Sequence, residues 1–401
     1  MFNCKIEFNN TTANVNFPCT NNLLYAKFAE MHVPDEIKAK IDIQIVEIDY
    51  EPLKCLEGKS YDPDAVNLLA QKLDSFTENE IRKFEAAREM NRITDIYDMI
   101  NLTENMHYYT LVTDMSDIKA VGKLHIMTKD GGIAAGEVDN IDFEAIGKKL
   151  IETGNGRITK YGNIYINSDL EYYEPCTRES LPPFQYYDRM LVCVEMSYQG
   201  NTNYVYLPDT PMALERAAYR MGAKDLSQCK YEIDYCDFHM GGYEEEREIK
   251  FNPDKLQEYL ENILNNEGAE KLYATVFWIA RLSNEKLAML VPVINYADRY
   301  DSEAVIKLAE CIDSFEVYGN VSSLYDLGIA LINDNPYYEL HPDIEDYFNF
   351  EKYGEDTDME WDGKFLAGDI YVGISDSTTL ENIFNGNEPD EDIEEGFELS
   401  M

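Results

Sequence analysis

The clearest metal-like spacing in the sequence lies near residue 360. Five residues fall at positions 1, 3, 5, 6 and 12 of a calcium loop, namely Asp358, Glu360, Asp362, Gly363 and Asp369. A calcium loop prefers Asp or Asn at position 3 and a bidentate Glu at position 12, and it needs a flanking helix where this pattern predicts a strand. We therefore favour a solvated acidic turn and predict no metal site.

The histidines, cysteines and glycines of the sequence do not occur at the spacings of known metal sites, redox pairs or phosphate loops. The five histidines show no metal-binding pair spacing, and the eight cysteines include no C-x-x-C pair. The glycines at 131–132 and 154–156 lack the Lys-Ser/Thr of a phosphate loop. Cys4 and Cys193 lie in apolar strand patterns that are typical of small core residues. We predict that the protein is not an enzyme and needs no cofactor.

Negative charge is the dominant chemical feature of the sequence. The 401 residues include 77 Asp and Glu against 34 Lys and Arg, which gives a net charge of −43. Solubility of a small domain needs a net charge of only about 2 to 8, and self-repulsion opposes compaction. A charge of this sign disfavours binding to nucleic acid or to anionic membranes. Basic protein surfaces are therefore the expected partners.

The acidic residues occupy polar strand positions and outward helix positions in most segments. Duplex DNA carries one charge per about 1.7 Å of axis, so 43 charges correspond to about 73 Å of duplex. This favours DNA mimicry, in which carboxylates stand where phosphates would. The predicted acidic surface consists of Asp42, Glu47, Asp49, Glu78, Glu85, Glu89, Glu244, Glu245, Glu246, Glu248, Glu258, Glu261, Asp343, Glu345, Asp346, Glu355, Asp356, Asp358, Glu360 and Asp362.

An internal repeat organises the elements that position these residues. Residues 13–20 match 203–210, which aligns Pro18 with Pro208, and later matches include 162–166 with 368–372. Six such matches occur in the same order, which indicates a tandem duplication. The predicted organisation is a first unit 1–169, a Tyr/Pro-rich linker 170–188, a second unit 189–376 and an acidic tail 377–401.

Both copies predict the same kinds of element. A hairpin, 2–17 or 190–207, precedes an amphipathic helix and a third strand, which together make a small three-stranded sheet. A helical middle part follows, and short helices with a closing strand complete each unit. The second copy has 16 extra residues in its helical part. The predicted fold class is α+β, an elongated chain of small domains in which each unit has an antiparallel sheet, a helical middle and a mixed α/β end. The tail has little apolar periodicity and should be mobile, although Ile383, Phe384, Ile393 and Phe397 could dock on a neighbour.

Several stretches of the sequence resemble the ArdA antirestriction proteins. They are Ile48-Asp49-Tyr50-Glu51, Asn67-Leu68-Leu69-Ala70 running into Phe84-Glu85-Ala86-Ala87, and Tyr347-Phe348-Asn349-Phe350-Glu351-Lys352-Tyr353-Gly354-Glu355-Asp356. The resemblance implies an acidic α+β mimic of bent DNA, carried by plasmids, transposons and phages, that occupies the DNA-binding groove of type I restriction-modification enzymes. It implies a distributed acidic surface and no catalytic residues. The chain is about twice the usual family length.

Alternative functions and assemblies stay open at this point. The acidic surface could instead inhibit another DNA-binding defence enzyme, such as an RNA-guided nuclease, or belong to a non-catalytic acidic scaffold protein. Duplication suggests a monomer whose two copies form an internal pseudo-dimer, with a homodimer as the alternative. The amino terminus lacks a basic region followed by an apolar one, and no apolar run approaches 18 residues. We therefore expect a cytoplasmic protein.

Overall fold

The computed structural model contains an α+β chain with several small antiparallel sheets. Residue contacts divide it into two units. Unit 1 comprises Met1–Asp188, Glu195–Val205 and Thr210–Lys230, and unit 2 comprises Arg189–Val194, Tyr206–Asp209 and Tyr231–Met401. The structure describes residues 2–134, 136, 138–153, 155–167, 169–183, 190–238, 240, 246–335, 347–375 and 378–385.

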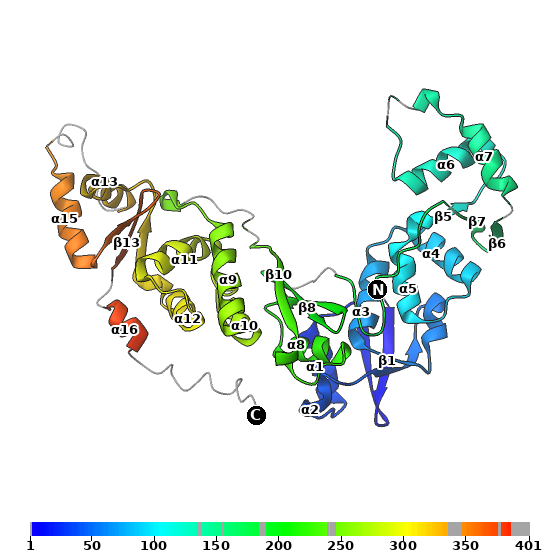
Figure 1. The fold of residues 1–401 in the computed structure, drawn as a ribbon, viewed down its shortest axis with the longest axis horizontal. Coiled ribbons are helices and arrows are strands. Elements are labelled where there is room, and N and C mark those ends of the chain that lie inside the picture. Colours follow the sequence, from blue (N-terminus) through cyan, green and yellow to red (C-terminus); the bar gives the residue numbers. More distant parts are fainter. Residues whose placement is uncertain are drawn as a thin grey trace. The chain divides into compact units, whose positions relative to one another are not determined.

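The first sequence copy folds into two sheets joined by helices (Figure 1). The first sheet has the order β2-β1-β3-β4 and the end sheet has the order β5-β7-β6. A fourth strand, β4, extends the expected three-stranded sheet because Tyr61 pairs with Ile43. The elements are β1 (Phe2–Phe8), β2 (Thr11–Phe17), α1 (Asn21–Glu30), α2 (Asp35–Lys38), β3 (Ile43–Ile48), η1 (Glu51–Leu56), β4 (Ser60–Tyr61), α3 (Pro63–Asp74), α4 (Glu78–Asn91), α5 (Ile96–Glu104), η2 (Met106–Tyr108), β5 (Tyr109–Val112), α6 (Ile118–Asp130), η3 (Val138–Asn140), α7 (Phe143–Glu152), β6 (Gly156–Thr159) and β7 (Gly162–Ile166).

The second sequence copy repeats this plan. Its sheets have the orders β10-β8-β9 and β11-β13-β12. The elements are β8 (Val192–Tyr198), β9 (Asn201–Leu207), α8 (Pro211–Arg220), η4 (Leu226–Gln228), β10 (Lys230–Cys236), η5 (Glu246–Glu248), α9 (Pro253–Glu267), α10 (Ala269–Ile279), α11 (Asn284–Ala297), α12 (Ser302–Glu310), η6 (Ile312–Ser314), β11 (Phe315–Tyr318), α13 (Leu324–Asp334), α15 (Phe350–Trp361), β12 (Lys364–Leu366), β13 (Ile370–Ile374) and α16 (Leu380–Asn385).

The strand orders of the two sequence copies correspond. In each copy the first strand lies between its hairpin partner and the third strand, and the last strand lies at the centre of the end sheet. Both hairpins turn through two residues at positive φ, Asn9-Asn10 in one and Gln199-Gly200 in the other. Where the first copy has α4 between α3 and α5, the second has both α10 and α11 between α9 and α12. The second copy therefore inserts its extra residues as helix.

The sequence match of 162–166 with 368–372 places the closing strand of the second copy two residues too early. The observed strand β13 is Ile370–Ile374. The β6–β7 hairpin closes with Thr159 paired to Gly162, whereas the β12–β13 hairpin closes with Leu366 paired to Ile370. The second hairpin loop is one residue longer, so its glycine lies in the turn instead of the strand.

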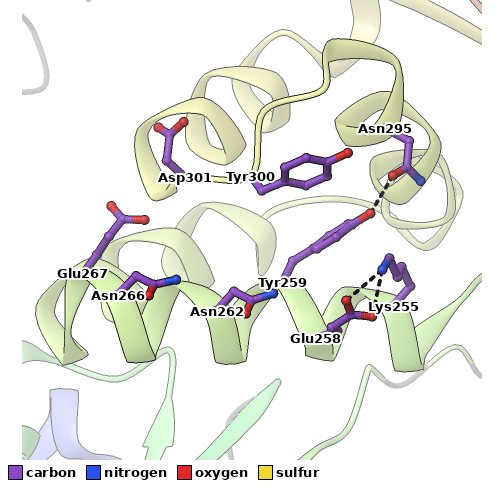
Figure 2. A pocket seen from close by; sticks show the side chains of 9 residues that line it. All are labelled: Lys255, Glu258, Tyr259, Asn262, Asn266, Glu267, Asn295, Tyr300 and Asp301. Carbon is purple, nitrogen blue, oxygen red and sulfur yellow. Dashed lines mark hydrogen bonds and ion pairs between the residues drawn. The ribbon is translucent and has the colours of Figure 1, made fainter.

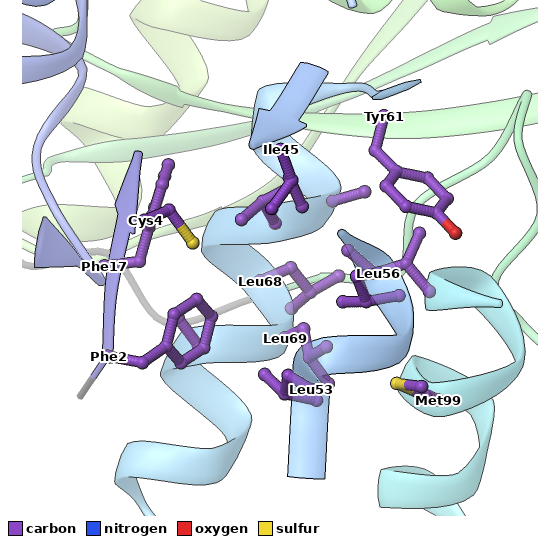
Figure 3. Packing of buried hydrophobic residues seen from close by; sticks show 14 of the residues in the cluster. Phe2, Cys4, Phe17, Ile45, Leu53, Leu56, Tyr61, Leu68, Leu69 and Met99 are labelled. Carbon is purple, nitrogen blue, oxygen red and sulfur yellow. The ribbon is translucent and has the colours of Figure 1, made fainter. Parts of the chain in front are cut away.

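The first sheet and the helical middle of unit 1 share one apolar core. Alternate residues of β1 point inward, and they pack with residues of α3 and α5 such as Leu68, Leu69 and Met99 (Figure 3). Cys4 is fully buried in this core, and burial raises the pKa of its thiol to about 12. Cys4 is therefore a packing residue, as its strand pattern indicates.

Part of the predicted linker is built into unit 1. Cys176 and Leu181 are buried in its core. The Asn101 amide donates to the Cys176 carbonyl at 2.9 Å and accepts from the Cys176 N–H at 2.8 Å. This pairing satisfies both backbone groups of a buried residue, which a free linker would leave to water. The predicted unit boundaries at 169 and 189 therefore differ from the observed ones.

The predicted tail begins with an ordered helix. In α16, Ile383 is buried, and the Lys307 ammonium group donates to the Phe384 carbonyl at 3.0 Å. The Arg299 guanidinium lies over the Phe384 ring at 4.4 Å. The apolar pair at 383–384 therefore docks on α12 and its preceding loop, while residues 386–401 of the predicted tail lie outside the described residues.

A buried ion cluster explains why α8 belongs to unit 1. Arg220 Nε lies 2.8 Å from Asp62 Oδ2, and Arg216 Nη1 lies 2.6 Å from Asp64 Oδ1. The two arginine side chains are only 5% and 3% exposed. Arg216 also donates to the Tyr25 hydroxyl at 2.7 Å. Both carboxylates lie at the start of α3, so the cluster holds α8 against α1 and α3.

Removing one cation from this cluster should destabilise unit 1 strongly. We expect Arg220→Ala to lower the free energy of unfolding by about 3 to 5 kcal/mol, because it leaves the Asp62 carboxylate, only 13% exposed, without its ion-pair partner. Arg178→Ala is the matched control, since Arg178 pairs with Asp42 at 2.9 Å but is 71% exposed. It should cost less than about 1 kcal/mol. Urea unfolding of both variants measures the difference, and equal losses would contradict the assignment.

The same cluster predicts a pH dependence. Burial alone would raise the pKa of Asp62, but the Arg220 guanidinium outweighs burial and holds that pKa below its ordinary value. The stabilisation is therefore fully present above the unfolded pKa of about 3.9 and is lost as pH falls through the folded pKa. Urea unfolding should show Asp62→Asn less stable than wild type at neutral pH and approaching it in acid. A stability gap that is constant with pH would refute this.

Candidate functional site

Two equivalent helix pairs, α6–α7 and α13–α15, have opposite surface chemistry. Each pair packs through two glycines, and α13 and α15 lie side by side near β13 (Figure 1). A Cβ atom added to Gly122 or Gly328 would lie 1.9 or 2.0 Å from a backbone oxygen of the facing helix. For Gly147 and Gly354 the corresponding distances are 2.1 and 2.0 Å. The two pairs therefore have the same close backbone packing.

Their charges differ although their packing is shared. Helices α6 and α7 contain five lysines and three acidic residues, a net charge of +2. Helices α13 and α15 contain one lysine and seven acidic residues, a net charge of −6. Aligning Gly147 with Gly354 places Lys148 and Lys149 at the positions of Glu355 and Asp356. The scaffold itself therefore does not require the acidic residues.

Helix α15 holds acidic residues where they oppose helix stability. Glu355 and Asp356 share a single cation, Lys352, at 3.0 and 2.8 Å. The last turn of the helix has no basic residue, and Glu360 lies in it while Asp362 caps it. An anion near a helix C-terminus is unfavourable by about 0.3 to 1 kcal/mol at low ionic strength. These charges lower local stability, which indicates a role other than folding.

The acidic excess is concentrated in the end part of the second copy. Residues 1–169 contain 28 acidic and 18 basic residues, a net charge of −10, whereas residues 189–376 contain 37 and 15, a net charge of −22. Within 301–376 there are 19 acidic residues against 3 basic ones, a net charge of −16. The charge is therefore local, and α13 and α15 lie within its densest stretch.

Most of the predicted surface residues that the structure describes are exposed. Three of these exposed residues lie in or next to β3, two lie in α4, one lies in η5 and one in α9, and four lie in α15 or at its C-cap. These exposed residues are Asp42, Glu47, Asp49, Glu78, Glu89, Glu248, Glu258, Glu355, Asp356, Glu360 and Asp362.

Glu85 is a correction to the predicted surface. It is buried in α4, with a relative exposure of 7%. The Tyr50 hydroxyl donates to Glu85 Oε1 at 2.9 Å, the Tyr161 hydroxyl donates to Oε2, and Lys160 Nζ lies 3.5 Å from Oε2. Burial, and then the hydrogen bond to Glu85, raises the pKa of Tyr50. Glu85 thus ties α4 to Tyr50, two residues after β3, and to the β6–β7 turn. The apolar run Phe84-Ala86-Ala87 around it is the sequence signal for this burial.

Two further predicted residues are half-buried. Glu261 accepts a hydrogen bond from Gln257 at 2.8 Å within α9. Asp358 lies in the last turn of α15 near Tyr371, whose pKa is raised by burial and then by the Asp358 charge. Residues 358–361 form the end of α15. The predicted acidic turn is therefore wrong for these residues, and the chain leaves the helix only at Asp362.

The structure does not describe the side chains of the remaining predicted surface residues. Glu244, Glu245, Asp343, Glu345 and Asp346 lie outside the described residues, and for Glu246 only the backbone is described, in η5. Within the described ranges, no three His, Cys, Asp or Glu side chains are grouped so that they could hold a metal ion. No helix in the same ranges is long and apolar enough to cross a membrane.

The position of charge on α15 generates a stability test. We expect Glu360→Gln to raise the free energy of unfolding by about 0.3 to 1 kcal/mol, because it removes an anion from the helix C-terminus. Glu351→Gln, in the first turn of the same helix, should lower it slightly. Thermal unfolding at low and high salt measures both, and the difference should shrink as salt screens the dipole. A loss of stability in Glu360→Gln would show that its charge supports the fold.

Two comparisons with known proteins found no match to this chain. No protein-family model matches the chain, and no curated protein is found to be similar to it. The positions of the charges are therefore the observations from which a function can be inferred.

Proposed function

We propose that the chain is a non-catalytic DNA mimic that occupies the basic DNA-binding groove of a defence enzyme in the cytoplasm, with type I restriction-modification enzymes as the first candidates. The observation that carries this proposal is the charge reversal between the equivalent helix pairs α6–α7 and α13–α15. One scaffold holds a net +2 in one copy and −6 in the other. A partner with a basic surface accounts for an acidic excess that folding does not need.

The charge density of this helix pair suits a phosphate-binding groove. A helix of 12 residues such as α15 is about 18 Å long. Duplex DNA of that length carries about 11 phosphates, and the α13–α15 pair carries seven carboxylates, of which Glu351, Glu355, Asp356 and Glu360 are exposed on α15. Carboxylates accept the same charge-assisted hydrogen bonds from Lys and Arg as phosphate oxygens do. The pair can therefore occupy cation positions that normally hold DNA.

The uneven distribution of charge favours this function over an acidic scaffold protein. Acidity that served only solubility or a saline environment would coat both copies alike. Here residues 301–376 hold a net charge of −16, while residues 1–169 hold −10 over more than twice the length. Electrostatic complementarity of this kind raises association rates and fixes register on a basic partner. Any enzyme with a basic DNA groove meets the physical requirement, and the resemblance to ArdA proteins selects type I enzymes first.

Inhibition of DNA cleavage tests the proposal. Wild type should inhibit a type I restriction enzyme without affecting the DNA itself. Changing Glu351, Glu355, Asp356 and Glu360 together to Gln should raise the half-inhibitory concentration by about tenfold or more, since each exposed pair is worth up to about 1 kcal/mol.

The matched control lies on the equivalent helix pair. Changing Asp130, Glu144 and Glu152 of α6 and α7 to the corresponding amides removes carboxylates of the same exposed class. This variant should inhibit as wild type does. Equal weakening by both variants would show a dependence on net charge alone, and a wild-type chain that leaves cleavage unchanged would reject type I enzymes as the target.

A further inference from the structure

A cavity of about 530 Å³ opens in unit 2 between α9 and the residues that lead into α12 (Figure 2). Its floor is one face of α9, and its roof is the loop after α11. The lining residues are Lys255, Glu258, Tyr259, Asn262, Asn266, Glu267, Asn295, Tyr300 and Asp301. Two tyrosines, three amides, three carboxylates and one ammonium group therefore meet in one pocket.

The two tyrosine rings form the aromatic wall of this pocket. Their centroids are 5.2 Å apart, and the rings are tilted by 45°. The Tyr259 hydroxyl donates to Asn295 Oδ1 at 2.6 Å, which fixes its ring. Tyr300 lies above it in Figure 2 and keeps 40% of its surface exposed. An exposed ring face beside a cavity is a platform for a flat ligand group.

The carboxylates of the pocket are held in fixed directions. Both oxygens of Glu267 accept hydrogen bonds from Ser302, from its N–H at 2.9 Å and its hydroxyl at 2.6 Å. Asp301 accepts from the Ala304 N–H at 3.0 Å and so caps α12, and its other oxygen lies 3.3 Å from the Arg299 guanidinium. Each carboxylate oxygen can accept a second hydrogen bond. The pocket therefore offers preorganised acceptors next to aromatic rings.

Elsewhere in the chain, a tyrosine ring beside a carboxylate binds an arginine guanidinium. Arg216 lies over the Tyr25 ring at 5.0 Å while pairing with Asp64 at 2.6 Å. Arg247 lies over the Tyr318 ring at 4.9 Å while it pairs with carboxylates, Asp334 among them at 2.8 Å. In both places a guanidinium stacks on tyrosine and binds a carboxylate. The pocket has these two components, and within the described ranges no cation lies over the Tyr300 ring.

We propose that this pocket receives an arginine side chain of the basic protein that the chain binds. This inference rests on the proposed function and names the contact that would anchor it. A planar guanidinium fits against the Tyr300 ring and can donate two N–H groups to a carboxylate of the pocket, Glu267 or Asp301, which a lysine ammonium cannot do as well. Lys255 already lies over the Tyr259 ring at 5.1 Å and pairs with Glu258 at 2.8 Å, so the open position is at Tyr300.

Peptide titration tests the pocket without any DNA-binding enzyme. The full chain carrying 3-fluorotyrosine is titrated with acetyl-Gly-Arg-Gly-amide and with acetyl-Gly-Lys-Gly-amide, and fluorine NMR follows the Tyr259 and Tyr300 signals. The arginine peptide should shift both signals and bind about fivefold more tightly than the lysine peptide. Equal affinities, or shifts that avoid both tyrosines, would overturn the proposal.

Substitutions at Tyr300 separate stacking from general charge attraction, with the Tyr259 signal as the reporter. Tyr300→Phe keeps the ring and should keep the preference for arginine, whereas Tyr300→Ala should abolish it. Tyr347→Ala removes another tyrosine of unit 2, 86% exposed, and should change nothing. Retained preference in Tyr300→Ala would overturn the proposal.

The peptide titration and the cleavage assay can fail independently, so failure of the arginine pocket can be told apart from failure of the proposed function. If the arginine preference fails while the α15 variant still loses inhibition, the pocket proposal is wrong and DNA mimicry stands. If the pocket prefers arginine but the intact chain does not inhibit the enzyme, the proposed function is wrong for that target and the arginine site stands.

Discussion

Mutual repulsion of carboxylates is the constraint on which the rest of this structure depends. A chain with a net charge of −43 must fold against its own electrostatic field. It does so with local apolar cores and with cations placed where they meet several acids. Arg216 and Arg220 are buried among the carboxylates at the start of α3, and Arg247 joins two acidic residues near β11. Helix α15 contains one cation of its own, Lys352, which pairs with both Glu355 and Asp356.

The two sequence copies hold two similarly packed helix pairs that carry different surfaces. The glycine contacts that let α6 approach α7 recur between α13 and α15, and they fix the backbone while leaving the outward positions free. One copy uses these positions for lysines, and the other uses them for acidic residues. The backbone contacts are therefore structural, and the outward charges are open to selection by a partner. The arginine pocket adds a shaped contact to a surface that otherwise offers charge.

Local signals in the sequence predict much of the fold, and distant contacts decide the rest. The hairpins and the starts of α3 and α9 follow from alternation, turn residues and Pro at the first helical position. The burial of Glu85 depends on Tyr161, 76 residues away, and the packing of the predicted linker depends on Asn101, 75 residues from Cys176. Helical spacing predicts the exposure of Glu355, Asp356 and Glu360 of α15, but it does not predict that Asp358 is half-buried. It cannot predict the pocket, because Tyr259 of α9 and Tyr300 of the loop after α11 are 41 residues apart and meet only in the folded chain.

Mutual exclusion of the chain and DNA on one enzyme is the most direct test of this account. Sedimentation of a fluorescent duplex bound to a type I restriction enzyme shows whether added chain releases the duplex. DNA mimicry predicts release of the duplex without a ternary complex, and weaker binding of the chain as salt rises. A complex that contains the enzyme, the duplex and the chain together would contradict occupation of the DNA groove.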